Sequence, residues 1–172
     1  MREEPIMTSL IRNRNAVPNE WALLQSASGP DAFSALRGRK VLLPLELILS
    51  DEDEARAQLG AIGVWLDSHQ DLASIENRIA DFQLIALNFP VFSDGRPFSL
   101  ARRLRIDLGF TGEIRAIGDV LRDQLCFLER CGFNSFALRS DQDVDECLSA
   151  FDDFSSTYTA TALNQEPGFR RR

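Results

Sequence analysis

The sequence contains one lysine, Lys40, and one histidine, His69, among 172 residues. A P-loop motif is absent, and any Schiff-base chemistry would fall on that lysine. The three cysteines, Cys126, Cys131 and Cys147, form no CxxC pair. A tetrahedral zinc site or a four-thiolate cluster therefore cannot be assembled from the cysteines and histidine of one chain. We expect no metal and no cofactor.

The sequence also lacks a long apolar run, because its most apolar stretch, residues 41–49, is interrupted by Pro44 and Glu46. A membrane-spanning helix needs about 20 apolar residues, so no membrane association is predicted. The first ten residues include two glutamates and a proline where a secretion signal has an apolar stretch. We therefore expect a soluble cytoplasmic protein.

Basic residues are few relative to acidic ones, 19 against 26, which gives a net charge of -7 and a pI of about 4.8. Proteins that bind nucleic acids in general carry a basic surface, so nucleic acid is not an expected partner. Apolar residues make up 44% and charged residues 26% of the chain, which is typical of a globular protein. The length corresponds to about one domain.

Short apolar runs alternate with helical patterns along the chain. The runs begin at Ile62, Leu84, Ile114 and Ser135, and an earlier run covers residues 40–45 before an acid-rich segment at 50–59. Helical spacing of apolar residues follows each run, with Leu72, Ile75, Ile79 and Phe82 on one predicted helix face. Strands that alternate with helices predict parallel pairing and right-handed crossovers. We expect an α/β fold with about five βα units, either partial-barrel-like or open and doubly wound; the pattern does not give the strand order.

Both ends of the chain lack this alternation. Residues 1–39 predict an irregular, extended N-terminal arm that packs loosely or pairs with a partner. Residues 40–154 form the α/β domain, and residues 155–172 are expected to form a solvated C-terminal tail.

In parallel α/β proteins, ligands bind beyond the carboxyl ends of the strands. This rule selects the following polar residues: Asp67, His69, Asn88, Asp94, Arg96, Asp119, Arg139 and Asp141, with Gly95 in the turn between Asp94 and Arg96. Among them, Asp119 is a candidate catalytic acid or base and Asn88 a candidate to orient a ligand. Arg96, on the Asp94-Gly95 turn, is a candidate to bind a phosphate, sulfate or carboxylate through two hydrogen bonds, and Arg139 is a further ligand-binding candidate.

Each candidate also has a purely structural interpretation. Asp119 would cap the helix that follows it. Arg96 would form a surface ion pair with Asp94, which contributes little to stability. His69 would be an exposed neighbour of a helix cap. These alternatives stay open at the level of sequence.

Charge is distributed unevenly along the chain. Arg102, Arg103 and Arg105 make one predicted helix locally basic, whereas residues 141–153 are strongly acidic. Two solvated helix faces would explain this pattern. Alternatively, the arginines form a partner-binding surface that steers docking to another protein.

Several segments together resemble a bacterial family classed as domain of unknown function 934. They are residues 89–90, 92–96, 99–102, 112–116, 118–125 and 130–133. Weaker similarity extends from about residue 41 to about residue 154. The family has an aspartate before its Phe-Pro pair, where this chain has Asn88.

The resemblance implies a functional context. Members are typically encoded beside assimilatory sulfite reductase and sulfonucleotide reductase, and they are often labelled oxidoreductases. The first hypothesis is therefore an accessory protein of sulfite reduction that binds the sulfite reductase haemoprotein or its electron donor. The alternative is a small enzyme or ligand sensor that binds an anionic sulfur compound or phosphate at the strand ends. A homo-oligomer in which sheet edges cover each other is compatible with either hypothesis.

Overall fold

The structure is a computed structural model that describes residues 10–25, 31–50, 57, 59–154 and 160–162. The acid-rich segment at 50–59 and the C-terminal tail lie mostly outside the described residues. In chain order the elements are β1 (Leu10–Arg12), β2 (Asn15–Val17), β3 (Trp21–Leu23), α1 (Asp31–Ala35), β4 (Lys40–Pro44), α2 (Leu45–Leu49), β5 (Ala61–Leu66), η1 (Leu72–Ser74), η2 (Glu76–Asp81), β6 (Leu84–Phe89), α4 (Arg96–Ile106), β7 (Glu113–Gly118), η3 (Arg122–Gln124), α5 (Leu125–Cys131), β8 (Ser135–Phe136), α6 (Val144–Cys147) and η4 (Leu148–Asp152).

The strands of the described residues form one eight-stranded sheet in the order β2-β1-β8-β7-β6-β5-β4-β3. The strands from β3 to β8 are parallel and follow chain order, whereas β1 pairs antiparallel with both β2 and β8. Because each crossover advances in the same direction, right-handed connections place the intervening helices on the same face of the sheet. The α/β prediction is confirmed in its partial-barrel form, and the doubly wound alternative does not apply.

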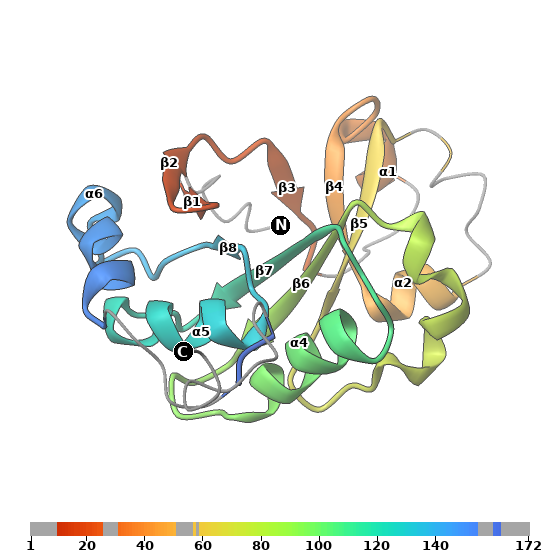
Figure 1. Cartoon of the computed structure of the whole chain (residues 1–172). Helices are drawn as coiled ribbons and strands as arrows, with labels where there is room; N and C mark the ends of the chain where they lie inside the picture. Colours follow the sequence, from red (N-terminus) through yellow and green to blue (C-terminus); the bar gives the residue numbers. More distant parts are fainter. Residues whose placement is uncertain (1–9, 26–30, 51–56, 58, 155–159, 163–172) are drawn as a thin grey trace.

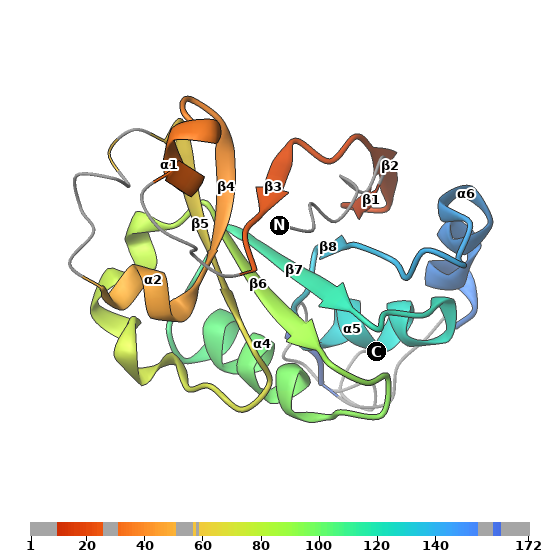
Figure 2. The same cartoon turned by 180° about the vertical axis from the view of Figure 1, so that it is seen from behind.

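The sheet is strongly curled, so that its two edges approach each other. Residues 18–20 alone separate β2 from β3, which lie at opposite edges. Four Cα–Cα steps span at most about 14 Å, whereas the edges of a flat eight-stranded sheet would lie about 34 Å apart. The N-terminal strands therefore lie across the side of the sheet opposite α4 and α5 (Figures 1 and 2).

Alternation along the strands divides the core into two clusters. The larger cluster lies between the sheet and the helices and includes Ile85 and Leu87 of β6 with Ala101 and Leu104 of α4. The smaller cluster lies on the concave face of the sheet and includes Trp21, Leu42, Leu84, Ala86, Ile117 and Ala137. Residues 84–87 are all buried because both faces of β6 are covered, as a continuous apolar run requires.

A buried arginine ties the N-terminal arm to the concave face. The Arg115 side chain is 2% exposed and donates hydrogen bonds to Glu113, to Ser135 Oγ at 3.1 Å and to Asn19 Oδ1 at 3.1 Å. Asn19 lies between β2 and β3, so this contact fixes the segment that joins the two sheet edges. Residues 10–23 thus contribute three short strands, whereas the sequence indicated an arm that packs loosely or pairs with a partner.

The helix predicted after β5 forms two 3₁₀ helices, η1 and η2. Its four apolar residues, Leu72, Ile75, Ile79 and Phe82, are nevertheless all buried. Leu72 and Ile75 are three residues apart, as are Ile79 and Phe82, and a helix of three residues per turn places the members of each pair on the same face. The burial prediction was correct, but the type of helix was not.

Candidate functional site

The predicted site residues gather where β5, β6, β7 and β8 end. We call this region the strand-end rim and define it as Asp67, His69, Asn88, Asp94, Gly95, Arg96, Asp119, Arg139 and Asp141. Parallel pairing places the carboxyl ends of the four strands at one edge, and hydrogen bonds between side chains link several of these residues across neighbouring strands.

Asp119 connects three segments of the rim. Its Oδ2 accepts a hydrogen bond from the Phe92 N–H at 2.9 Å, and its Oδ1 accepts one from Arg139 Nη1 at 2.7 Å. Its own N–H donates to the Phe89 carbonyl oxygen at 2.8 Å. The N-cap of η3 is Leu121, so the structure does not place Asp119 in the capping role that the sequence suggested. The carboxylate instead holds the loop after β6 against the ends of β7 and β8.

Asn88 lies at the end of β6 and faces Asp67 at the end of β5. Its Nδ2 donates a hydrogen bond to Asp67 Oδ1 at 3.2 Å, and His69 Nδ1 lies 3.4 Å from Asp67 Oδ2. Gly118 is packed against the other side of Asn88, and a Cβ there would lie 2.4 Å from Asn88 Oδ1. The tightly packed Asn88 amide therefore donates a hydrogen bond to the Asp67 carboxylate.

Arg96 and Asp94 form a two-point ion pair at the start of α4. The Arg96 Nε lies 2.9 Å from Asp94 Oδ1, and its Nη2 lies 2.6 Å from Oδ2. The Asp94 side chain is 6% exposed and the Arg96 side chain 60% exposed. The hydrogen bond from Arg96, followed by that from the Ser68 side chain, holds the pKa of Asp94 well below its usual range. Gly95, between them, is exposed and occupies the N-cap position of α4.

Arg139 is likewise paired with carboxylates of the chain. It binds Asp141 through Nε at 2.7 Å and Nη2 at 2.8 Å, in addition to Asp119. Its hydrogen bonds to Asp141 and then to Asp119 raise the pKa of Arg139, and the contact with Arg139 lowers the pKa of Asp141. Four carboxylates and two guanidinium groups therefore occupy the rim. An anionic ligand would have to displace a carboxylate from either arginine.

The three arginines predicted as a partner surface lie in three different environments. Arg103 forms ion pairs with Asp71 at 2.8 Å and with Glu76. Arg105 is half-buried and donates to the carbonyl oxygens of Phe110, Gly112 and Gly132, and burial lowers its pKa. Arg102 is exposed on α4. The partner-binding prediction for these residues stays a prediction, and Arg102 is the member whose guanidinium lies open to solvent.

Three exposed aromatic side chains on or beside α5 were not selected from the sequence. Phe92 is 54% exposed, Phe127 55% and Phe154 64%. Phe127 could have been found, because it lies outside the apolar face formed by Leu125 and Leu128 of α5. Nothing in the local sequence distinguishes Phe92 from an ordinary loop residue.

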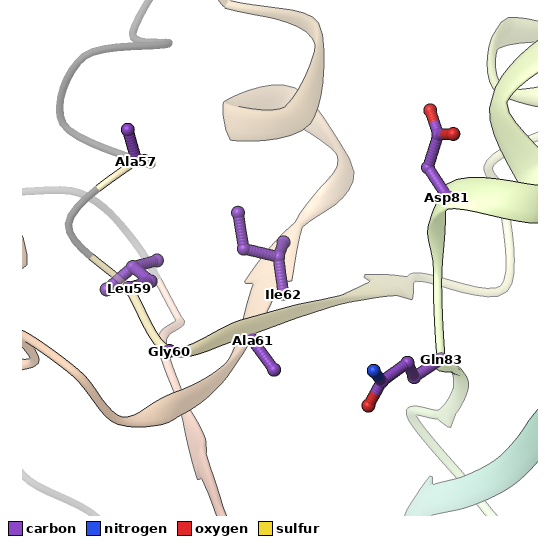
Figure 3. Close-up of a pocket in the computed structure, with 7 residues that line it drawn as sticks. All are labelled: Ala57, Leu59, Gly60, Ala61, Ile62, Asp81 and Gln83. Atoms are coloured by element: carbon purple, nitrogen blue, oxygen red, sulfur yellow. The ribbon is translucent and has the colours of Figure 1, made fainter.

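A recess of about 350 Å³ lies at the opposite end of the sheet, where β5 begins and β6 is about to start (Figure 3). It is lined by Ala57, Leu59, Gly60, Ala61, Ile62, Asp81 and Gln83. None of the predicted site residues lines it. Its one charged side chain, Asp81, forms an ion pair with Arg78 at 3.6 Å.

Two other features, a metal site and a membrane-spanning helix, are absent from the described residues. Nowhere among them do three or more His, Cys, Asp or Glu side chains gather in an arrangement that could hold a metal ion. Across the same part of the chain, every helix is too short or too polar to cross a membrane.

Comparison with known proteins identifies a family. No curated protein and no solved structure matches the chain. Residues 63–169, more than half of the sequence, match the family described as bacterial protein of unknown function (DUF934). The match covers β5 from residue 63 onward, β6 to β8, the whole strand-end rim and helices α4 to α6. The chain therefore belongs to the DUF934 family of bacterial proteins.

Proposed function

We propose that this protein is a cytoplasmic accessory protein of assimilatory sulfite reduction that binds the sulfite reductase haemoprotein or its electron donor. The family resemblance supplies this context, since members are typically encoded beside the reductase. The observation that carries the proposal is a group of aromatic side chains, Phe92, Phe127 and Phe154, each more than half exposed. Aromatic and arginine side chains are enriched in protein–protein interfaces.

Affinity purification of the tagged full-length chain tests this proposal in its native host, grown with sulfate as the sole sulfur source. We expect sulfite reductase or its electron donor to be recovered in amounts comparable to the bait. The matched control is the same host grown on cysteine, where the demand for sulfite reduction is low. Recovery of neither protein under sulfate growth would contradict the proposal.

A second function is favoured by a separate observation at the rim. Arg139, 43% exposed, donates to Asp119, and Arg96, 60% exposed, interacts with the charge of Asp67, the hydrogen-bond partner of Asn88. We propose as the alternative a small enzyme or ligand sensor for an anionic sulfur compound or phosphate. Arg96 would bind the anion, Asp119 would act as acid or base, and Asn88 would orient the ligand. The pairing of both arginines with carboxylates weakens this alternative.

Calorimetric titration with sulfite, sulfate and inorganic phosphate tests the alternative. If the rim binds an anion, Arg96→Ala abolishes binding, whereas Arg37→Ala, remote from the rim, leaves it unchanged. Asp119→Asn removes the candidate acid or base and keeps an oxygen for the Phe92 N–H, but it loses the ion pair with Arg139, so the unfolding midpoint of the variant is measured beside its activity. Failure of all three anions to bind would exclude the ligand classes named here.

A further inference from the structure

The outer surface of α4 and α5 combines exposed aromatic rings with arginines. We call it the α4–α5 face and define it by Phe92, Arg102, Phe127, Arg130 and Phe154. The two helices pack against each other, and Phe127 of α5 contacts the ring of Phe98 of α4 with centroids 4.9 Å apart. They lie side by side below the sheet in both views (Figures 1 and 2). Phe92 adjoins α5, since its carbonyl oxygen accepts a hydrogen bond from Gln124 Nε2 at 2.7 Å.

Contacts with residues between this face and the core hold its aromatic residues in place. The ring of Phe98 also contacts Phe89, at 5.2 Å, and Phe89 contacts the buried Phe133, at 5.9 Å. Phe127 therefore rests on a stack of rings that reaches the core. The Phe92 backbone is fixed at both polar groups, since its N–H donates to Asp119 and its C=O accepts from Gln124. A surface ordered before binding loses less entropy on association.

The arginines of this face differ from most others in the chain. Arg14, Arg103, Arg115, Arg122 and Arg139 each pair with a carboxylate. Within the part of the chain that the structure describes, neither Arg102 nor Arg130 forms an ion pair. Arg130 instead lies over the ring of Phe154, 5.4 Å from its centroid. In a protein of net charge -7, these two arginines thus have no carboxylate partner within the described residues.

Exposed acidic residues border the face, among them Asp123, Asp152 and Asp153. Asp123 precedes Phe127 by one helical turn, and it raises the pKa of Arg122, whose guanidinium binds Asp153. Asp152 and Asp153 directly precede Phe154; Asp153 pairs with Arg122, and Asp152 lies 3.7 Å from Arg14. Among the described residues, neither Arg102 nor Arg130 pairs with any of these carboxylates. Complementarity then favours a partner surface that carries carboxylates.

We infer that the α4–α5 face binds an acidic protein surface, with Phe92, Phe127 and Phe154 in apolar contact and Arg102 and Arg130 paired with carboxylates of the partner. This inference rests on the proposed function for the identity of that partner, sulfite reductase or its electron donor. A nucleic acid fits less well, because two arginines on a chain of net charge -7 neutralise few phosphates.

Photo-crosslinking in the native host tests the inference. Phe127 is replaced by p-benzoylphenylalanine in the full-length chain, and the crosslinked protein and its attachment site are identified by mass spectrometry. A second chain carries the same photoreactive residue at Arg37, which lies before β4 and is exposed. We expect position 127 to crosslink to sulfite reductase or its electron donor near Asp or Glu residues, and position 37 to give no such product.

Binding measurements with the purified partner then test the charge. Arg102→Glu lowers the affinity about tenfold and reduces its dependence on salt, whereas the matched charge reversal Arg37→Glu leaves both unchanged. Phe127→Ser lowers the affinity by a similar factor without reducing the salt dependence. Equal effects of Arg102→Glu and Arg37→Glu would show that overall charge, not this face, governs binding.

The outcomes separate the surface from the proposed function. A crosslink from position 127 to a different acidic protein supports the face and contradicts the function. A partner recovered by affinity purification that never crosslinks to position 127 supports the function and overturns the face. A crosslink between two copies of this chain, or to lipid, also overturns it.

Discussion

Replacement of Arg105 by methionine tests whether this arginine of α4 stabilises the fold, in contrast to the exposed Arg102 on the same helix. Methionine keeps the length and packing of the side chain and removes all its donors. The Arg105 guanidinium donates four hydrogen bonds, to the carbonyl oxygens of Gly132 at 2.8 Å, Phe110 at 2.6 Å and Gly112 at 2.8 Å, and to Asn134 Oδ1 at 3.1 Å. These contacts join α4 to the start of β7 and to the turn before β8.

The magnitude follows from this geometry. A hydrogen bond from a charged donor contributes about 1.5–3 kcal/mol, but half-burial of Arg105 lets water reach some of the acceptors, and removal of the charge relieves its desolvation. We therefore expect Arg105→Met to lower the free energy of unfolding by about 3 kcal/mol. For a chain of this size the midpoint temperature then falls by roughly 6–12 °C.

Urea unfolding followed by circular dichroism measures this change. The matched control is Arg102→Met on the same helix, which is exposed and is expected to change the free energy by less than about 0.5 kcal/mol. If the two variants unfold at the same urea concentration, the reasoning that Arg105 is structural is refuted. The order of the two effects is reversed for partner affinity: Arg102→Met weakens the partner contact, whereas Arg105→Met does not.

Three further predictions concern the rim and the cysteines. Gly118→Ala lowers the free energy of unfolding by at least about 2 kcal/mol, because φ of Gly118 is +90° and the new Cβ would lie 2.4 Å from the Phe89 carbonyl oxygen. Equal unfolding midpoints for the variant and the natural chain would contradict this prediction. The pKa of Asp94 is lowered on folding, so below about pH 4 the unfolded chain binds a proton that the folded chain does not. Stability is therefore full above that pH and falls as the pH decreases, and Asp94→Asn makes the decrease between about pH 4 and pH 2 shallower in urea titrations. Burial raises the pKa of the Cys131 thiol, so its alkylation by iodoacetamide in the folded chain is slower than in urea at the same pH; equal rates would contradict the described environment.

The parts of the fold that could be predicted from sequence depend on local patterns. The predicted starts Ile62, Leu84, Ile114 and Ser135 lie within one residue of the observed strands, because continuous apolar runs mark strands that are buried on both faces. Gly132 ends α5 with a φ of +115°, the left-handed conformation in which glycine commonly follows a helix. Strand order was not predictable, since sequential and doubly wound sheets share the same alternation.

The parts that could not be predicted depend on contacts between distant segments. The strands β1 and β3 are three residues long and acquire their pairing from β8 and β4, so no periodicity marks them. Arg102, Arg103 and Arg105 are the same residue type on one helix. A hydrogen bond to the carbonyl oxygen of Gly132, 27 residues away in sequence, nevertheless gives Arg105 a structural role. Asp119 looked like a helix cap because Val120 follows it; its carboxylate instead binds Phe92 and Arg139, which come from other loops.

The central claim is that this protein binds a component of sulfite reduction, and direct titration tests it most simply. The full-length chain is immobilised and exposed to purified sulfite reductase haemoprotein, and separately to its purified electron donor, from the same host at low and moderate salt. The account predicts saturable binding of one of the two with micromolar or tighter affinity, weakened by salt and by Arg102→Glu. Absence of binding of both proteins at low salt would contradict it.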